Sequence, residues 1–306
     1  MVNISSWEEL IAFSNSTDSS SEYGDNTNGD SEATWTGAEV VDFDELDIGP
    51  FYGTVCIRGR IDFRGAVFRN MTWYKKGSDG SCLRFIVGGP TTASEKDMHN
   101  DCTKNLVIEN LLYEPTNVET QGTIIYMQSK TGSWGHVEKC KFTIKAMCSC
   151  TSSGIVAVNC LNSSSNVELC PKECSFNVEA ISAAGAVYLI STSSGFRDCL
   201  FDVNIKANST SASGSQGGAL TNCLVRGKIE NTNTSSNAPV PVFSNSTNKF
   251  NNYLLEGSYS IASSAGKSIY DNTKMTLTNV DANMIGYDPD NVNMADLKAA
   301  GFPCYA

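Results

Sequence analysis

The chain has 306 residues, and its 33 acidic and 22 basic side chains give it a net charge of −11 at pH 7. This negative charge disfavours non-specific binding to nucleic acid or to an anionic membrane, so we expect neither as a partner. No segment approaches the about 20 consecutive apolar residues of a membrane-spanning helix, and Met1-Val2-Asn3-Ile4 lacks the basic and apolar stretches of a signal peptide.

The N-terminal residues predict a short helix followed by a polar segment. Ser6 and Glu9 have the Ser-x-x-Glu spacing of a capping box, and apolar residues follow at helical spacing up to Phe13. Residues 14–34 contain almost no large apolar side chain, which predicts a flexible linker. Order is expected to resume near Trp35. We therefore assign residues 1–50 to a cap helix and a flexible Ser/Asn-rich segment.

From about Gly53 onward apolar and polar residues alternate, and one short phrase then recurs. It has six positions. The first and the sixth are apolar, the third is usually Asn, Asp or Lys, and the fourth is a second apolar residue or Cys. The second and the fifth vary. The fourth residues of the eight copies, one of them degenerate, are at positions 71, 111, 140, 174, 199, 223, 253 and 280. Their mean spacing is about 30 residues, a period that is typical of solenoid proteins.

Each copy alternates as a strand with one buried face does, and a second apolar run, such as Gly185–Ile190, lies between copies. Linking stretches rich in Ser, Asn, Thr and Gly favour turns. Such units bury their apolar faces only when they stack, at about 4.8 Å per strand. The sequence therefore predicts an all-β fold, a single-stranded right-handed parallel β-helix over residues 51–290. One or two helical turns near Met294–Gly301 would form a C-terminal cap over residues 291–306.

The alternative architecture is an antiparallel β-sandwich, whose strands are also short and alternating. It requires hairpin turns about every 8–12 residues. Asn-Gly and Asp-Gly pairs occur only at Asn28-Gly29 and Asp79-Gly80. The scarcity of turn signals favours the parallel arrangement.

Twelve cysteines prompt a search for disulfides or a metal site. One group of four occupies the same position in four successive copies: Cys140, Cys174, Cys199 and Cys223. In a stacked coil their side chains would form an internal ladder of small apolar groups. A second group is Cys148, Cys150, Cys160 and Cys170. For this group free thiols, a local disulfide and a zinc site all stay open, although its spacing fits zinc poorly.

Candidate catalytic residues are few. Neither of the two histidines, His99 and His136, has a credible arrangement of nucleophile and acid in its neighbourhood. A glycosidase on this fold would pair carboxylates from related positions, for which the candidates are Glu138, Glu173, Asp198 and Asp202. A lyase would combine acidic and basic residues, for which the candidates are Asp62 with Arg58, Arg60, Arg64 and Arg69. Surface ion pairs explain these groups equally well, so we assign no catalytic residue, cofactor or metal ion.

The pattern resembles the pectin-lyase-like right-handed β-helix proteins, and among them the β-helical virion proteins of tailed bacteriophages, such as head-decoration proteins, head fibres and tailspikes. The likeness is carried by the entry segment Gly59–Gly65, the repeated strands through Val280 and the closing Leu297-x-x-x-Gly301-Phe302-Pro303, and covers residues 50–303. It implies a rigid rod, assembled as a homotrimer and released with the virion. The chain departs from the tailspike enzymes because it lacks recognisable paired catalytic carboxylates.

These inferences favour a non-enzymatic structural protein exposed on a phage virion, as a capsid decoration, a head fibre or a tail-associated protein made in the host cytoplasm. The expected partners are other virion proteins and further copies of the chain, with host-surface carbohydrate as an additional candidate. Two alternatives stay open: a β-helical polysaccharide-degrading enzyme and a bacterial surface adhesin. The candidate interface residues, which would otherwise seal the first layer of strands, are Trp7, Trp35, Phe51 and Tyr52.

Overall fold

The protein is described by a computed structural model, which is mostly β. The residues whose structure it describes are 2–16, 32–75, 81–87, 102–115, 122–129, 136–148, 155–161, 171–182, 187–192, 196–197, 199–208, 214–216, 220–221, 224–231, 243–244, 253–254 and 259–261. Within these ranges there is one helix, α1 (Trp7–Ser16), and all other regular elements are strands. The prediction of an all-β chain is therefore confirmed. The predicted C-terminal cap lies outside the described residues.

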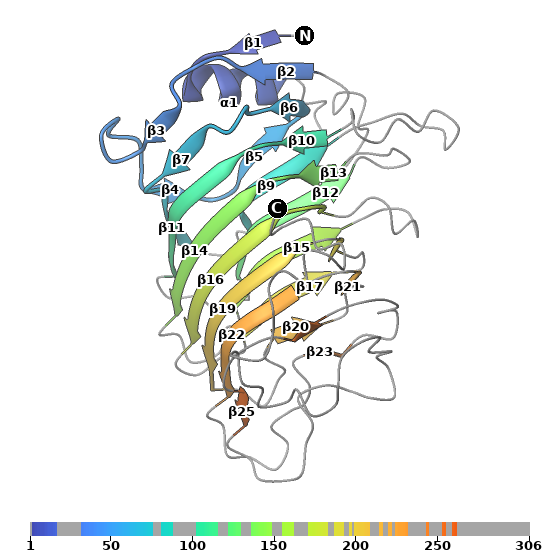
Figure 1. Ribbon diagram of the computed structural model, residues 1–306. Coiled ribbons are helices and arrows are strands. Elements are labelled where there is room, and N and C mark those ends of the chain that lie inside the picture. The colour runs from blue at the N-terminus through green and yellow to red at the C-terminus, as the bar shows by residue number, and fades with distance from the viewer. Residues whose placement is uncertain are drawn as a thin grey trace.

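The strands form three parallel sheets, called here A, B and C (Figure 1). Sheet A contains β1 (Val2–Ile4), β2 (Glu32–Trp35), β6 (Arg60–Asp62), β10 (Cys102–Lys104) and β13 (His136–Glu138). A short parallel pair, β18 (Phe196–Arg197) and β21 (Leu220–Thr221), lies further along the chain.

Sheet B follows the path β3 (Val40–Asp42), β7 (Val67–Arg69), β11 (Val107–Pro115), β14 (Lys141–Cys148), β16 (Ser175–Ser182), β19 (Leu200–Ala207), β22 (Leu224–Asn231) and β24 (Tyr253–Leu254). Three further strands pair beside this path: β4 (Phe51–Tyr52), β8 (Thr72–Lys75) and β25 (Tyr259–Ile261). Sheet C contains β5 (Val55–Arg58), β9 (Ser81–Val87), β12 (Gly122–Ser129), β15 (Ile155–Leu161), β17 (Val187–Thr192), β20 (Gly214–Gln216) and β23 (Phe243–Ser244).

The chain passes through the three sheets repeatedly in the same order. β10, β11 and β12 belong to sheets A, B and C, and β13, β14 and β15 follow in the same sequence. Each strand pairs with the strand one cycle later, for example residue by residue from Lys141 opposite Ser175 to Cys148 opposite Ser182. No antiparallel pairing occurs among the described strands, which argues against the sandwich alternative.

Because side chains alternate along a strand, a single strand contributes side chains both to the core and to the surface. In β16 the side chains of Phe176, Val178, Ala180 and Ser182 are buried, whereas those of the residues between them are partly or fully exposed. Phe176 stacks on Phe142 of β14 and on Phe201 of β19, with ring centroids 5.2 and 5.0 Å apart. Phe85 of sheet C meets Phe142 at 6.0 Å. The sheets therefore share one apolar interior.

The corner between sheets A and B explains the Asn, Asp or Lys of the repeated phrase. Asn105, Lys139 and Glu173 each end a sheet A segment with φ between 52 and 59°. This left-handed conformation favours Asn and Gly over most residues. The following residue points into the core, and the next strand of sheet B then begins. In the copies that contain Cys140 and Cys174, the third position of the phrase is thus this bend, and the fourth is a core position.

The predicted equivalence of Met71 and Leu111 with Cys140 is wrong. Backbone hydrogen bonds join Val107 N to Ala66 O, Lys141 N to Leu106 O and Ser175 N to Cys140 O, at 2.8–3.0 Å. The core column is therefore Ala66, Leu106, Cys140, Cys174 and Cys199, all buried. The misassignment arises because Asn70 and Asn110 form a second left-handed bend, with φ of 63 and 54°, between apolar residues of sheet B.

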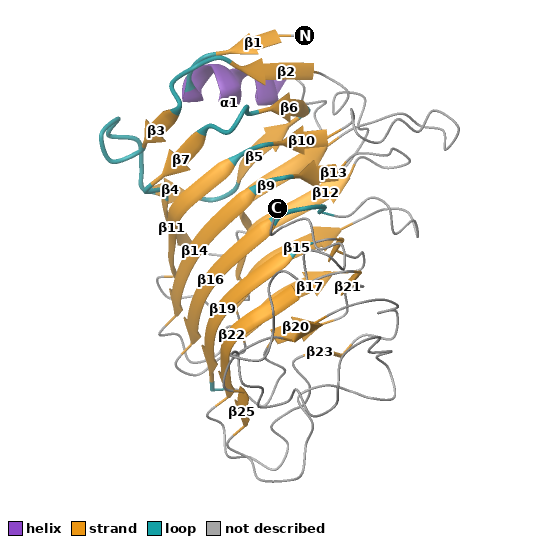
Figure 2. Cartoon of the chain, viewed as in Figure 1, coloured by secondary structure: helices purple, strands orange, loops and turns teal. Residues whose placement is uncertain are grey.

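Helix α1 covers the N-terminal end of the interior (Figure 2). Trp7 packs edge-on against Phe43 at 5.0 Å and Phe68 at 6.0 Å, and Ser14 Oγ accepts a hydrogen bond from Arg58 N of β5. The helix runs to Ser16, beyond the predicted Phe13, and the strands already begin at Val2. Of the linker predicted for residues 14–34, residues 17–31 lie outside the described part. No helix in the described part is long and apolar enough to cross a membrane.

Candidate functional site

Charged side chains line the corner between sheets A and B. Lys139 Nζ lies 3.1 Å from Glu138 Oε1 and 3.8 Å from Glu173 Oε2, and Lys172 Nζ lies 3.3 Å from Glu173 Oε1. The Glu138 side chain is only 3% exposed, whereas that of Lys139 is 53% exposed. Hydrogen bonding to Glu138 raises the pKa of Lys139, and the charges of Glu138 and Glu173 act in the same direction. The lysine stays protonated and bridges two carboxylates.

A buried thiol lies behind this charged group. Cys102 Sγ is 3.6 Å from Glu138 Oε2. Burial raises the pKa of Cys102 to about 12, and the neighbouring Glu138 charge contributes further. A thiol with such a pKa stays protonated at neutral pH and is a poor nucleophile. Cys102 therefore serves as a hydrogen-bond donor to the carboxylate.

The cysteine ladder lies at the next core position of the corner. Cys140, Cys174 and Cys199 are fully buried and lie directly before the adjacent strands β14, β16 and β19, whereas Cys223 lies outside the described residues. Cys174 Sγ lies 3.5 Å from Val137 O and 3.3 Å from Lys172 O, and Cys140 Sγ lies 3.3 Å from Glu138 O. Burial raises the pKa of Cys140 well above its ordinary value, as does the contact with Cys174. These thiols donate to carbonyl groups of the bend.

Other residues that the sequence suggested for a glycosidase or lyase site have separate partners. Arg60 pairs with Glu32 at 3.2 Å and Arg69 with Asp42 at 2.7 Å, while Asp62 accepts from the Asn105 amide at 2.9 Å. Asp202 lies in register with Asn177 and Arg226 in sheet B, and Asp198 lies outside the described residues. The carboxylates of Asp42, Asp62, Glu138 and Glu173 are thus engaged in structural ion pairs and hydrogen bonds.

The second cysteine group is divided between sheets. Cys148 ends β14 in sheet B and Cys160 lies in β15 of sheet C, whereas Cys150 and Cys170 lie outside the described residues, as does His99. His136 begins β13. Within the part of the chain that the structure describes, no group of three or more His, Cys, Asp or Glu side chains is placed to hold a metal ion.

The burial of two aromatic residues corrects the prediction that Trp7, Trp35, Phe51 and Tyr52 form an interface. Trp7 and Trp35 are only 6% and 3% exposed, because their rings pack on Phe43, Phe63 and Phe68 in the core. Neither is available to a partner. Phe51 is partly buried against Trp73 at 4.6 Å. Tyr52 is 63% exposed and stacks on Tyr74 at 5.8 Å, so it alone of the four presents a large surface to solvent.

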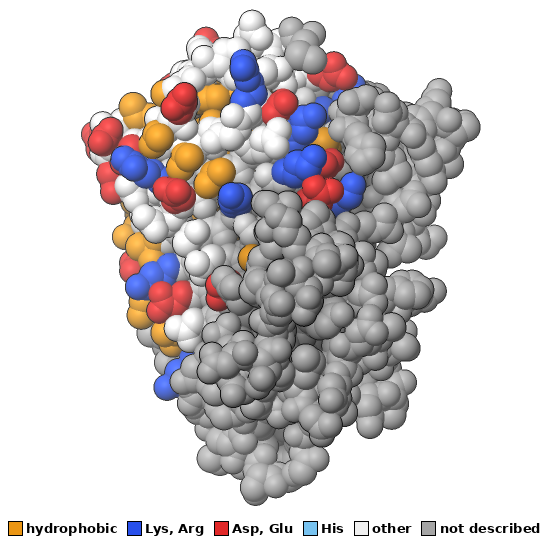
Figure 3. Space-filling model, viewed as in Figure 1, with side chains coloured by type: hydrophobic (Ala, Val, Ile, Leu, Met, Phe, Trp, Pro, Cys, Tyr) orange, Lys and Arg blue, Asp and Glu red, His pale blue; other side chains and the backbone are white. Residues whose placement is uncertain are grey.

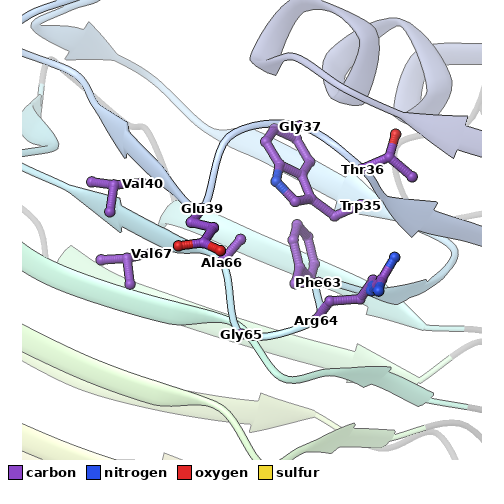
Figure 4. Close-up of a pocket in the computed structure, with 10 residues that line it drawn as sticks. All are labelled: Trp35, Thr36, Gly37, Glu39, Val40, Phe63, Arg64, Gly65, Ala66 and Val67. Carbon is purple, nitrogen blue, oxygen red and sulfur yellow. The ribbon is translucent and has the colours of Figure 1, made fainter.

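A pocket of about 420 Å³ opens beside the buried Trp35 (Figure 4). Its lining residues come from the segments before β3 and before β7, and include Glu39, Val40, Arg64, Gly65 and Val67. Glu39 and Arg64 lie on opposite sides of the turn at Gly65. A Cβ atom at Gly65 would meet no atom within 4 Å, so the space above this turn is open. The sequence signalled neither this pocket nor its polar flanks, because they depend on the pairing of β3 with β7.

An outer polar row adjoins the pocket. Asp42 Oδ2 accepts from Arg69 Nε at 2.7 Å and Asp42 Oδ1 from Asn70 Nδ2 at 2.9 Å, and Asn110 Nδ2 donates to Asn70 Oδ1 at 3.4 Å. The hydrogen bond from Asn70 lowers the pKa of Asp42, and Arg69 adds to this effect. The row fixes the edge strand β3 to its neighbours.

Comparisons of the chain with protein-family models, with curated proteins and with solved structures found no match.

Proposed function

We propose that the chain is a right-handed parallel β-helix and a non-enzymatic structural protein of a tailed-phage virion. The observation that carries the architecture is the repeated passage through sheets A, B and C, with each strand pairing in parallel one cycle later. Parallel connections of this kind are right-handed in nearly all proteins. The shared interior and the helix over its N-terminal end are what a stacked solenoid requires.

The structural role is supported by how the corner carboxylates are used. Glycosidases keep one carboxyl group protonated as an acid and a second one as base or nucleophile. Here Glu138 and Glu173 both form ion pairs with the Lys139 ammonium group, an arrangement that is typical of a structural charge network. The virion assignment, the homotrimeric state and contact with host carbohydrate come from the family resemblance described above.

Two measurements test this proposal. The purified protein is incubated with a panel of bacterial surface polysaccharides, and we expect polymer length to stay unchanged; catalytic shortening would support the enzyme alternative instead. Antibodies against the protein are then applied to purified phage particles of the source and imaged by electron microscopy. Labelling at one defined position supports the virion role, whereas its absence from particles contradicts it.

A further inference from the structure

Exposed apolar side chains are concentrated at the N-terminal end of sheet B. Of the five large hydrophobic residues that are exposed in the described part of the chain, four lie between residues 2 and 52: Val2, Val40, Leu46 and Tyr52. Val40 belongs to the edge strand β3, Tyr52 to the edge strand β4, and Leu46 to the turn between them. We call Val40, Leu46, Tyr52 and the adjoining Val67 the edge patch.

The turn holds Leu46 outward in a fixed position. Leu46 N donates to Asp42 O and Ile48 N donates to Phe43 O, both at 3.1 Å, and Phe43 is buried in the core. Asp42 is in turn bonded to Arg69 and Asn70. Leu46 is nevertheless 53% exposed. A large apolar side chain presented by an ordered turn is a preorganised contact, which lowers the entropic cost of binding.

Within the described part of the chain, α1 covers one end of the stack, but no described element covers the edge formed by β3 and β4. Helix α1 packs on the edge strand β5 of sheet C and its Trp7 seals the interior. Figure 3 shows hydrophobic side chains gathered over β3 and β7, beside acidic side chains of the adjoining turn. An uncovered apolar strand edge promotes association, so proteins normally protect it or use it as an interface.

The charge around the patch indicates the chemistry of the partner. Glu39, Asp44, Glu45 and Asp47 are exposed, and none of them forms an ion pair with another described residue. Arg69 is bonded to Asp42 and also attracts Glu45. A second copy of this chain, with its net charge of −11, would bring further negative charge to this rim. A partner with Lys and Arg around an apolar centre would satisfy it.

We propose that the edge patch is the docking surface for a different protein, one whose contact surface is apolar at its centre and rimmed by Lys and Arg. The neighbouring pocket supplies an anchor point: a basic side chain lays its aliphatic stem along Val40 and Val67 and places its charge beside Glu39. This inference does not depend on the virion role.

The test uses the full-length protein and two sets of synthetic peptides of equal length, one patterned with Leu and Lys and the other with Leu and Glu. Binding is measured by fluorescence anisotropy at low and high salt. We expect the Leu/Lys set to bind and to weaken as salt rises. Leu46→Ser combined with Val40→Ser should weaken binding about tenfold. Asp44→Asn combined with Asp47→Asn should reduce the salt dependence, because two of the four carboxylates around the patch are then neutral.

The matched control is Met147→Ser, because Met147 is 45% exposed on sheet B away from the patch. It should bind as the unaltered protein does, and circular dichroism should show that all variants are folded. Equal binding of the Leu/Glu set, an absence of binding by either set, or an equal loss in Met147→Ser would overturn the proposal. A lower oligomeric state of the Leu46→Ser, Val40→Ser variant in sedimentation would also overturn it, because the occupant would then be a second copy.

Discussion

At the scale of single residues, the column of cysteines combines packing with hydrogen bonding. The sequence predicts that Cys140, Cys174 and Cys199 are core residues, because they recur at one position of the phrase. The contacts of the Cys140 and Cys174 thiols with carbonyl groups of the bend are not predictable from that pattern, since they depend on the left-handed conformation of Lys139 and Glu173. Cys fits this position because it is both a small apolar side chain and a weak donor.

The central thiol of the column provides a test of this dual role. Cys174→Ala should lower the free energy of unfolding by about 1–3 kcal/mol, because it removes buried volume and the weak hydrogen bonds from the thiol to Val137 O and Lys172 O. Cys174→Ser retains a donor and should lose less than Cys174→Ala. Urea unfolding followed by circular dichroism measures both. Equal losses, or a larger loss for Ser, would show that the thiol acts through packing alone.

Burial and raised pKa values also make these thiols unreactive. With a pKa of about 12, Cys102 is almost entirely protonated at pH 8, and Cys140, Cys174 and Cys199 are inaccessible. Alkylation at pH 8 followed by peptide mass spectrometry should leave these four unmodified until denaturant is added. Cys56, which is only partly buried, is the internal control and should react sooner. Rapid native labelling of Cys102 or Cys174 would contradict the described packing.

The lowered pKa of Asp42 predicts how stability depends on pH. A carboxylate with a lower pKa in the folded than in the unfolded state stabilises the fold above its ordinary pKa of 3.8, and this contribution is lost as the pH falls through the folded value. Asp42→Asn should therefore be less stable than the unaltered protein at neutral pH, and the difference should shrink below pH 3.8. Urea unfolding at a series of pH values measures it.

The neighbouring Asp44→Asn serves as the control for this series. Asp44 is exposed and forms no ion pair with another described residue, so the variant should unfold with a free energy close to that of the unaltered protein. A constant difference between Asp42→Asn and the unaltered protein at all pH values would refute the role of the ionised carboxylate.

At the scale of elements, the bend between sheets A and B determines which residue types can occupy its left-handed position. Asn105 adopts φ of 59° and its amide donates to Asp62. Asn105→Val should cost about 2 kcal/mol, because a β-branched residue is strained in the left-handed region and the hydrogen bond is lost. The same change at Asn177, an exposed position within β16, should alter stability by less than about 0.5 kcal/mol. Thermal unfolding compares the two variants, and similar losses would contradict the assigned bend.

The sequence pattern predicts long elements better than short ones. Strands such as β14, β16 and β19 carry several alternating apolar residues, and the capping box predicts α1. Ser6 Oγ does accept from Glu9 N at 3.2 Å, but the Glu9 carboxylate accepts from Ser5 N at 2.7 Å. β1 and β3 have only three residues each, which is too few for a periodic signal. They form because the neighbouring strand offers unpaired backbone groups, a tertiary effect.

The same limit explains which site features the sequence missed. The sequence does not show whether Trp7 and Trp35 lie at the surface or in the core, because their burial depends on the packing of α1. The pocket and the edge patch combine residues near positions 40, 50 and 65, which pairing in sheet B brings together. Alternation places side chains on a face of a sheet but does not say which edge of the sheet stays uncovered.

At the scale of the whole molecule, one arrangement accounts for the repeat, the core and the two proposals. If the chain winds as a right-handed β-helix, every cycle adds one strand to each sheet and one layer to the shared interior. The N-terminal end then has a sealed interior and an open edge of sheet B, which is where the edge patch lies. The proposed virion role and the proposed docking surface both use this rod, but each has its own test.

A crystal structure of the full-length protein tests the winding most directly. We predict that Lys145, Glu179 and Asn204 lie side by side on adjacent parallel strands, in the register of β14, β16 and β19. We also predict that the connections through sheets A, B and C have a right-handed sense. Antiparallel hairpins between neighbouring segments, with Cys140, Cys174 and Cys199 separated from one another, would contradict the account.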